Sequence, residues 1–522
     1  MFNRGRCILV VASAVCLHCV GDDSTMTVDA GMDTSVSDTS TGDASNDVAT
    51  EANPCATAPT LTYYVNTATG NDANSGAGPS CAMKTITAAL MASNTAAHAN
   101  ATINIAAGTY NLDEQFPLIV DRGRSLVGAG ATMTIIQGSS STFNTNATGS
   151  FLDSGTHFVT ILAGDLMVAA DAGVPVGATT ISDLSVLPPT TITMPTTNYL
   201  GIVCIAGNAP PSGAVLPLPP PNLILNGVTV GPNFDADISL SYETSPAAGC
   251  NALVTNSTIT GANTGLITGG CGGTTNPTTS SPSAQIGDGQ PADANTFTTS
   301  TVDLLGSGCG SIQSINFNHF SSGYRGIVLI SGAAQYFEIL SNTFTGGSTS
   351  MPMGIGVNTN SGAVINKLNG NTFTNISETA AADTAVGGTS GYAIAFGGSM
   401  ILQARSNLID NNDNGILLSG NPSSTMFDFS SGGMTSTANQ IFCNSKPPSP
   451  PVGIANGYDV ILGYGSGNMP NFQGNTWDDG SPTTSASLTT SPNGTDIVGT
   501  SVAVTTGGVT TGATCTGGRV HQ

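Results

Sequence analysis

One segment of the chain brings together residue types that could bind or process a ligand. Residues 403–415, QARSNLIDNNDNG, contain Arg405, Asp410 and Asp413, and the preceding stretch adds Glu378 and Asp383. Carboxylates bind calcium or accept hydrogen bonds from hydroxyl groups, and an arginine can bind a carboxylate through two parallel hydrogen bonds. Asn and Asp also bond to their own backbone in turns. The segment therefore predicts either a binding or catalytic site, or an Asn/Asp-rich turn.

A second candidate lies in residues 70–76, GNDANSG. Asp72 and Asn74 alternate as the oxygen ligands of calcium loops do, although the later bidentate acid of such loops does not follow. A plain turn is the alternative. His98, His157 and His319 have no partner at the spacing of metal ligands, and the sequence contains no Gly-x-Ser-x-Gly elbow or phosphate-binding loop. Calcium is therefore the only cofactor that the sequence suggests.

The composition predicts an all-β protein. Only 8% of the residues are charged, where soluble domains carry about a quarter. Long charged helical faces cannot be common, whereas 39% hydrophobic residues and 66 Gly suit short strands and turns. The net charge of -22 with ten basic residues excludes nucleic acid as a partner, because phosphates require clustered Lys and Arg.

The N-terminal residues predict export. Residues 1–21 begin with Arg4 and Arg6 and continue with an apolar stretch over residues 8–17, which suits an export signal. The join CLHC resembles that of bacterial lipoproteins, in which Cys19 would carry lipid; secretion after Ala14 is the alternative. Residues 22–54 predict a disordered acidic Ser/Thr/Asp linker. We expect an extracytoplasmic protein, either secreted or an outer membrane lipoprotein, that contacts a membrane only through this anchor.

The cysteines predict disulfides. Outside the signal region eight remain: Cys55, Cys81, Cys204, Cys250, Cys271, Cys309, Cys443 and Cys515. An even number in an exported chain, with no CxxC or CxxH pair, favours disulfides over metal ligands. Cys55 and Cys81 flank the start of the folded region, which makes them the first candidate pair.

A repeated motif indicates a solenoid. An Asn is followed two residues later by a large apolar residue at successive offsets of 23, 24, 29, 36, 32 and 36 residues. The pairs are Asn295/Phe297, Asn318/Phe320, Asn342/Phe344, Asn371/Phe373, Asn407/Ile409, Asn439/Ile441 and Asn475/Trp477. Val186, Val230 and Ile259 continue the apolar column without the Asn. Propeller blades need a more constant period of about 40 to 50 residues.

Other strands accompany this motif in each period. Aliphatic runs such as GIVLI at Gly326 and GILLS at Gly415 predict a second strand, and YFEIL and AVINKL predict a third. These periods predict a right-handed parallel β-helix in which the Asn and Phe columns stack inside the turns at about 4.8 Å. The intervening Thr residues and His319 should then face solvent, because strand side chains alternate; the Thr positions are 296, 343, 372 and 476.

The ends of a solenoid need covering, since strand edges pair with other chains. Residues 84–94, KTITAALMASN, together with Ala97 have apolar residues at helical spacing and predict a short N-terminal capping helix. Residues 496–515 alternate as strands do and predict a segment that folds back over the last coil. The Pro-rich residues 210–222 and 446–452 predict loops that leave the solenoid. We therefore expect a β-helix over residues 55–479 and a C-terminal cap or tail over residues 480–522.

The start of the folded region resembles a known family. Residues 62–90, TYYVNTATGNDANSGAGPSCAMKTITAAL, followed by INIAAGTYN at 103–111 and SLVGAGATMTIIQG at 125–138, resemble the opening of DUF1565-type, pectate-lyase-like β-helix proteins. The coil pattern extends this likeness to about Trp477. The resemblance implies a carbohydrate-facing protein exported from a bacterial cell, because relatives with this opening include polysaccharide lyases and alginate epimerases.

The catalytic residues of those relatives do not carry over. The Asp-Pro-His of the epimerases is missing, as are the Gly-His-Gly and Arg-Ile-Lys of polygalacturonase-like hydrolases. The leading hypothesis is thus a cell-envelope β-helix that presents a surface to a polysaccharide, a cell-surface glycan or a protein. The alternative is a calcium-assisted polysaccharide lyase or hydrolase at Arg405, Asp410 and Asp413. That alternative predicts that the three side chains converge in one groove with Lys367 or Arg325 nearby.

Overall fold

The computed structural model describes residues 55–499 of the chain, with several gaps. The gaps are residues 58, 139–157, 166–176, 191–198, 207–220, 233, 241–249, 262, 269–282, 299–300, 308–311, 322, 331–335, 348–352, 378–390, 420–425, 445–457, 464–469, 478–481, 483 and 486–495. The described residues belong to one compact unit, Asn53–Gln522. The expected signal, linker, Cys19 anchor and Pro-rich loops fall wholly or almost wholly outside them. No helix in the described part is long and apolar enough to cross a membrane.

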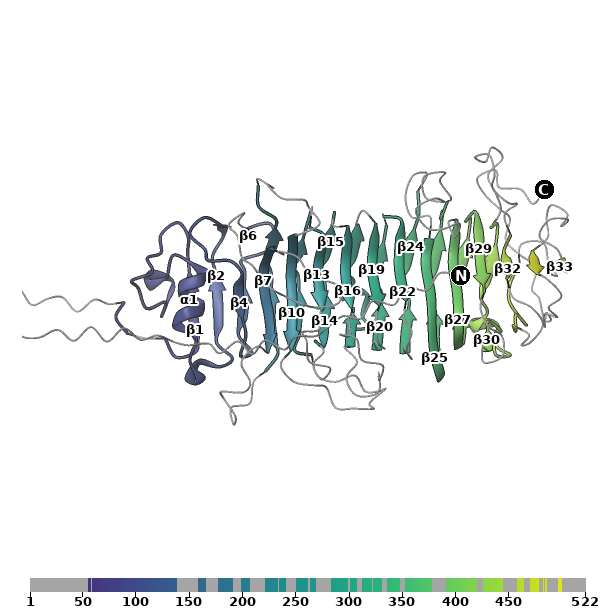
Figure 1. The fold of residues 1–522 in the computed structure, drawn as a ribbon, viewed down its shortest axis with the longest axis horizontal. Helices are drawn as coiled ribbons and strands as arrows, with labels where there is room; N and C mark the ends of the chain where they lie inside the picture. Colours follow the sequence, from purple (N-terminus) through teal and green to yellow (C-terminus); the bar gives the residue numbers. More distant parts are fainter. Residues whose placement is uncertain are drawn as a thin grey trace, which may run out of the picture. The chain divides into compact units, whose positions relative to one another are not determined.

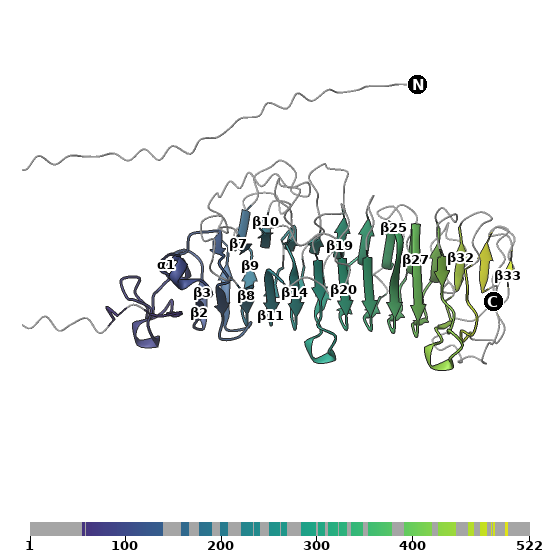
Figure 2. The same cartoon turned by 90° about the horizontal axis from the view of Figure 1, so that it is seen from below.

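The described strands form a right-handed parallel β-helix, as the repeats predicted. Every strand pairs in parallel with its counterpart one coil away, and the strands stack one after another from β1 to β34 (Figures 1 and 2). Between the two terminal coils, each coil contributes a strand to each of three faces, which we number in the order in which the chain visits them. The sequence therefore predicted the fold class correctly.

The three faces consist of the following strands. Face 1 contains β1 (Thr62–Val65), β2 (Thr102–Ile105), β5 (Ser125–Val127), β8 (Thr179–Ser182), β11 (Leu223–Asn226), β14 (Ala252–Thr255), β17 (Ser283–Ile286), β20 (Ile312–Asn316), β23 (Tyr336–Leu340) and β30 (Met426–Asp428). Face 2 contains β3 (Gly108–Tyr110), β6 (Thr134–Gln137), β9 (Ser185–Leu187), β12 (Thr229–Val230), β15 (Thr258–Thr260), β18 (Thr296–Thr298), β21 (His319–Phe320), β24 (Thr343–Thr345), β26 (Thr372–Thr374), β28 (Leu408–Asp410) and β31 (Gln440–Phe442). Face 3 contains β4 (Leu118–Val120), β7 (Phe158–Asp165), β10 (Tyr199–Ala206), β13 (Ala236–Leu240), β16 (Thr264–Thr268), β19 (Val302–Ser307), β22 (Arg325–Ile330), β29 (Asn414–Leu418), β32 (Val460–Leu462), β33 (Thr484–Ser485) and β34 (Ile497–Gly499).

Two long strands join face 3 to face 1. In β25 (Met353–Asn369) and β27 (Tyr392–Arg405) the first half pairs within face 3 and the second half within face 1. The register between them shifts between Asn360 and Ile365, where the chain passes from one face to the other. The second half of β25 is the third strand that AVINKL predicted.

In most coils the corner between face 1 and face 2 is short, although longer segments precede β6, β18 and β31. In seven coils two residues separate the strands, and the first of them has a left-handed backbone: Asp183, Gly227, Asn256, Phe317, Ser341, Gly370 and Ser406, with φ between 49° and 68°. Non-glycine residues rarely adopt this conformation outside turns. The chain therefore makes the same sharp bend in each of these coils.

From β18 onward an Asn directly precedes each face 2 strand, and these Asn side chains form a buried ladder. Each Nδ2 donates to the Oδ1 of the Asn in the next coil over 2.8–3.2 Å, from Asn295 through Asn318, Asn342, Asn371, Asn407 and Asn439 to Asn475. Each Oδ1 also accepts the backbone N–H of the preceding Asn, as in Asn342 N–H to Asn371. The ladder satisfies polar groups that are otherwise costly to bury. The predicted structural role of the Asn column is confirmed.

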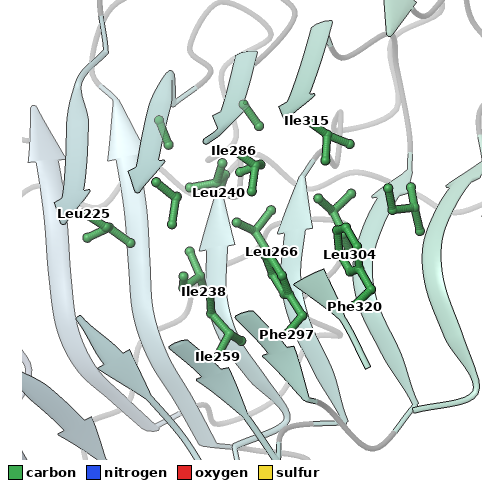
Figure 3. Packing of buried hydrophobic residues seen from close by; sticks show 14 of the residues in the cluster. Leu225, Ile238, Leu240, Ile259, Leu266, Ile286, Phe297, Leu304, Ile315 and Phe320 are labelled. Atoms are coloured by element: carbon green, nitrogen blue, oxygen red, sulfur yellow. The ribbon is translucent and has the colours of Figure 1, made fainter. Parts of the chain in front are cut away.

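The interior is apolar and ordered in columns. Leu225, Ile259 and Leu266 come from faces 1, 2 and 3 and belong to the apolar core shown in Figure 3. On face 2 the rings of Phe297, Phe320, Phe344 and Phe373 stack with centroids 4.7–4.9 Å apart. These rings are fully buried, whereas Thr343 and Thr372 between them are half-buried and His319 is exposed. The alternation expected for face 2 is therefore present.

Helix α1 (Ile86–Ala92) covers the N-terminal end, as predicted. Thr85 accepts a hydrogen bond from Ala88 N at 3.0 Å, and Glu114 accepts Ile86 N and Thr87 N at 2.8 Å each. Acceptors at a helix N-terminus satisfy its free N–H groups. Ala97 lies outside this helix, in the 3-10 turn η2 (Ala96–His98), because α1 ends at Ala92. Further 3-10 turns are η1 (Pro79–Cys81), η4 (Pro291–Asp293) and η6 (Thr435–Thr437).

Pairing continues past residue 479 at the C-terminal end. Strand β34 pairs in parallel with β32 and β33, so Ile497, Val498 and Gly499 add a further coil to face 3. Residues 500–515, the rest of the predicted C-terminal segment, lie outside the described residues.

Candidate functional site

A line of hydrogen-bonding side chains runs along the outer surface of face 1. It consists of Gln285, Ser314, Glu338, Lys367, Gln403, Asp428 and Asn471, which we call the polar row. Each member is the direct partner of the next across neighbouring coils, and all are half-buried. The polar row is outward because residues on either side of it, such as Ile339 and Leu368, fill the core.

Glu338 and Lys367 form an ion pair in the middle of the polar row. Lys367 Nζ lies 2.6 Å from Glu338 Oε1, and the hydroxyl of Tyr336 donates to the same oxygen at 2.5 Å. Burial by itself would raise the pKa of Glu338, but the hydrogen bonds from Lys367 and Tyr336 outweigh it and lower that pKa. Burial, and then the bond to Glu338, raise the pKa of Tyr336. Glu338 is therefore ionised and Tyr336 is neutral at neutral pH.

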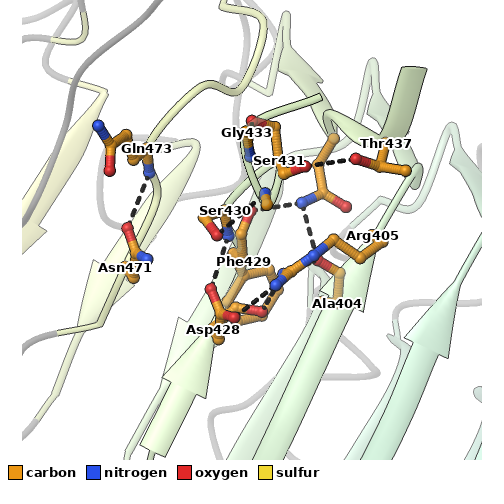
Figure 4. A network of polar contacts seen from close by, with 12 residues as sticks. Ala404, Arg405, Asp428, Phe429, Ser430, Ser431, Gly433, Thr437, Asn471 and Gln473 are labelled. Carbon is orange, nitrogen blue, oxygen red and sulfur yellow. Dashed lines mark hydrogen bonds and ion pairs between the residues drawn. The ribbon is translucent and has the colours of Figure 1, made fainter. Parts of the chain in front are cut away.

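Arg405 forms the second ion pair of this surface (Figure 4). Its guanidinium bonds to the carboxylate of Asp428 and donates to the backbone oxygens of Asp428 at 2.8 Å and Ala404 at 3.0 Å. Asp428 also accepts Ser430 N at 3.1 Å. Burial opposes ionisation of Asp428, but the hydrogen bonds from Arg405 and Ser430 hold its pKa below the usual value. The pair fixes both side chains against the surface.

The structure does not bring the three predicted catalytic candidates together. Arg405 ends β27 at the face 1 corner, whereas Asp410 ends β28 at the far side of face 2. Asp413 lies beyond that strand, with 5% of its surface exposed. Lys367 shares face 1 with Arg405, and Arg325 begins β22 on face 3. Glu378 and Asp383 lie outside the described residues.

The predicted metal candidates make hydrogen bonds within the protein. Asp72 Oδ1 accepts Lys84 N and Thr85 N at 2.8 Å each, and Asn74 Nδ2 donates to Ala82 O at 3.0 Å. These bonds hold the segment before α1. Among the described residues, no group of three or more His, Cys, Asp or Glu side chains is placed to hold a metal ion.

Disulfides close segments of the solenoid. Cys55 bonds to Cys81, the pair that the sequence suggested, and Cys204 bonds to Cys250. Cys443 is disulfide-bonded as well. Disulfides persist in oxidising compartments, so the structure is that of an extracytoplasmic protein.

Sequence reasoning overlooked most of the polar row. Its signal was present in the third strands, YFEIL, AVINKL, ILQAR and MFDF, each of which places a polar residue directly before an apolar core residue. Aligning these strands coil by coil would have placed Glu338, Lys367, Gln403 and Asp428 in one line. The irregular spacing of the strands concealed it.

Fold and repeat define the class: a right-handed parallel β-helix with an Asn ladder and an N-terminal capping helix. Residues 68–206 match the family described as "Protein of unknown function (DUF1565)". The match covers the first coils and confirms the resemblance to DUF1565-type proteins in that part of the chain.

Among solved structures, the chain is similar to other large proteins at low identity. The A-module of the mannuronan C-5 epimerase AlgE6 from Azotobacter vinelandii is 12% identical, with 82% of this chain and 94% of that chain covered and a TM-score of 0.28. The GH136 lacto-N-biosidase from Eubacterium ramulus is 10% identical, with coverages of 86% and 67% and a TM-score of 0.42. The Dettilon tailspike protein is 11% identical, with coverages of 74% and 66% and a TM-score of 0.31. No curated protein matches the chain.

Proposed function

We propose that this protein is an extracytoplasmic β-helix protein that binds a polysaccharide or cell-surface glycan on face 1, at the polar row. One observation carries the proposal: seven coils in succession present an outward carboxylate, amide, hydroxyl or ammonium group in one line. These groups donate and accept hydrogen bonds of the kind that sugar hydroxyls make. The predicted lipid anchor at Cys19 would hold such a protein at the cell envelope.

The surroundings of the polar row support a sugar ligand. Tyr336, Ile365 and Ile401 form the neighbouring column of face 1, and Ile365 is 50% exposed. Binding sites commonly combine apolar contact with a few fixed polar groups. The ion pairs of Lys367 and Arg405 hold their side chains in place before a ligand arrives, which reduces the entropy lost on binding.

A hydrolase at the polar row has less support from the described geometry. Its two carboxylates, Glu338 and Asp428, are three coils apart, which is about 14 Å at the usual strand spacing. Glycosidases place their catalytic carboxylates about 5 to 9.5 Å apart. The calcium-assisted lyase or hydrolase stays a prediction, and release of reducing ends from any bound glycan, with and without calcium, tests it.

A matched pair of lysine variants tests the proposed site. Lys367 and Lys84 are both paired with an acid, with side chains 40% and 45% exposed, but Lys84 lies at the N-terminal cap beside Asp113. We expect Lys367→Ala to weaken binding in a glycan panel by about tenfold, equivalent to a lost charge-assisted hydrogen bond. Lys84→Ala should bind as the wild type does. Equal affinities of the two variants for the glycan would show that the binding site does not lie at the polar row on face 1.

A further inference from the structure

The polar row, taken as the binding site of the proposed function, also specifies the ligand. We infer that the ligand is a neutral, extended polysaccharide that lies along the solenoid axis with one sugar residue per coil. This inference rests on the proposed function and adds the ligand's charge, direction and repeat to it.

The first argument is spacing. The members of the polar row pair directly across six successive steps, from Gln285 to Asn471. Stacked rings on the adjoining face fix the rise of a coil at 4.7–4.9 Å. One pyranose residue in an extended, equatorially linked glycan has nearly this length. A chain along the axis therefore places one sugar beside each coil. Because neighbouring residues of such a chain are turned by about half a turn, equivalent hydroxyl groups recur at every second coil. A chain across the strands would contact one or two members only.

The second argument is charge. Both cations that the described part of face 1 presents, Lys367 and Arg405, are already paired with Glu338 and Asp428. The site is thus neutral as a whole, within a chain of net charge -22. The field of such a chain repels anionic polymers at low ionic strength. A neutral glycan is not repelled and needs no free cation.

The third argument is shape. Ile365 and Ile401 are direct partners in adjacent coils, beside Lys367 and Gln403 of the polar row. Their side chains, exposed at Ile365 and half-buried at Ile401, form a low apolar strip beside the polar one. An extended pyranose chain has the matching pattern, since its hydroxyl groups lie at the edge of each ring and its C–H groups on the ring faces.

The test is a length series of two charge classes. Neutral β-1,4-linked oligosaccharides of glucose, mannose and N-acetylglucosamine, from two to eight residues, are titrated against the full protein by calorimetry at low and at high salt. Oligogalacturonates of the same lengths form the second class. We expect affinity for one neutral series to rise several-fold with each added sugar up to six or seven, with little effect of salt.

Variants locate the binding. Gln403 is an uncharged member of the polar row. Gln403→Ala should weaken binding of the long neutral oligosaccharides about three- to tenfold and leave disaccharide affinity almost unchanged. Thr372→Ala, an outward substitution on face 2, is the control, and equal melting temperatures show that both variants fold.

Each contrary result has a distinct meaning. Tighter binding of oligogalacturonates that salt weakens would overturn the inference and leave glycan binding at face 1 intact. A disaccharide that binds as tightly as a hexasaccharide would overturn the axial arrangement. Binding of neither class would contradict the proposed function itself.

Discussion

Asp237, on face 3, carries a fully buried carboxyl group. It belongs to β13, all five residues of which are buried, and its own exposure is 0%. Burial raises the pKa of Asp237 well above its usual value, and the backbone of Thr260 offsets this only in part. A buried group of this kind stays protonated when the unfolded chain has already ionised.

Asp237 should therefore reduce stability as the pH rises. A raised folded-state pKa contributes stability below the unfolded pKa, and this contribution is lost as the pH increases toward the folded value. We expect Asp237→Asn to leave the melting temperature unchanged near pH 3.5 and to raise the free energy of unfolding by more than about 1 kcal/mol at pH 7. Melting curves from pH 3.5 to 8 measure this. A difference between the two proteins that does not grow with pH would show that Asp237 is ionised in the folded state.

The sequence gives no warning of this residue. The alternation in ADISL would place Asp237 and Ser239 on a solvated surface, but β13 is buried on both sides. Ile238 belongs to the main core, and Ala236 packs in a second apolar cluster with Leu200 and Val203. Burial of the outer side depends on contacts distant in sequence, which a strand's own periodicity does not record.

At the scale of the elements, we expect the Asn ladder to be the interaction whose stability is most sensitive to a single substitution. Asn371 accepts two hydrogen bonds from Asn342 and donates to Ile339 O and Asn407. Asn371→Ala leaves the backbone N–H of Asn342 and one N–H of its side-chain amide buried and unpaired, while Nδ2 keeps its bond to Ile315 O. We expect a loss of about 2 to 5 kcal/mol in the free energy of unfolding. Thr372→Ala, one residue away and outward, should cost less than about 0.5 kcal/mol. Urea denaturation of both variants compares them, and similar midpoints would mean that the ladder contributes little.

The elements differ in how well the sequence predicted them. The Asn and Phe columns were predictable, because neighbours in space occupy the same position of successive repeats and keep their type. The partner of Arg405 was not. Asp428 lies in MFDF, a strand without the repeat motif, and only the register of β30 on β27 places it beside Arg405. Asp410 and Asp413 are close to Arg405 in sequence, but β28 runs between them and Arg405. The two carboxylates therefore lie beyond the far end of face 2 from Arg405.

For the whole molecule, the exposed edge of the first coil is the point where unwanted association would begin. The segment before α1 pairs with the outer edge of β1, through Tyr64 N to Gly76 O at 3.0 Å and Asn66 N to Met83 O at 2.8 Å. The Cys55–Cys81 disulfide closes this segment. Unpaired strand edges recruit other chains, so we expect the disulfide, by holding this segment on β1, to protect the solenoid from end-to-end pairing.

A comparison of the two disulfides tests this protective role. We expect the double variant Cys55→Ser/Cys81→Ser to form larger species at temperatures below its melting transition, as measured by light scattering after size exclusion. Cys204→Ser/Cys250→Ser should lose a similar stability, about 2 to 4 kcal/mol, without a change in size. Association in both variants, or in neither, would show that the Cys55–Cys81 bridge does not specifically protect the strand edge.

The constant corner between faces 1 and 2 has a consequence for how such a chain can change over time. Seven coils keep two residues there, although the Asn-to-Asn distance along the sequence varies from 23 to 36 residues. In these seven coils, variation in length therefore falls at the other two corners. A coil could be duplicated or deleted as a unit, with its Asn joining the ladder in register, and could then diverge in length without disturbing its neighbours. The polar row would lengthen or shorten with it, so the number of coils would set the length of glycan that the surface can hold.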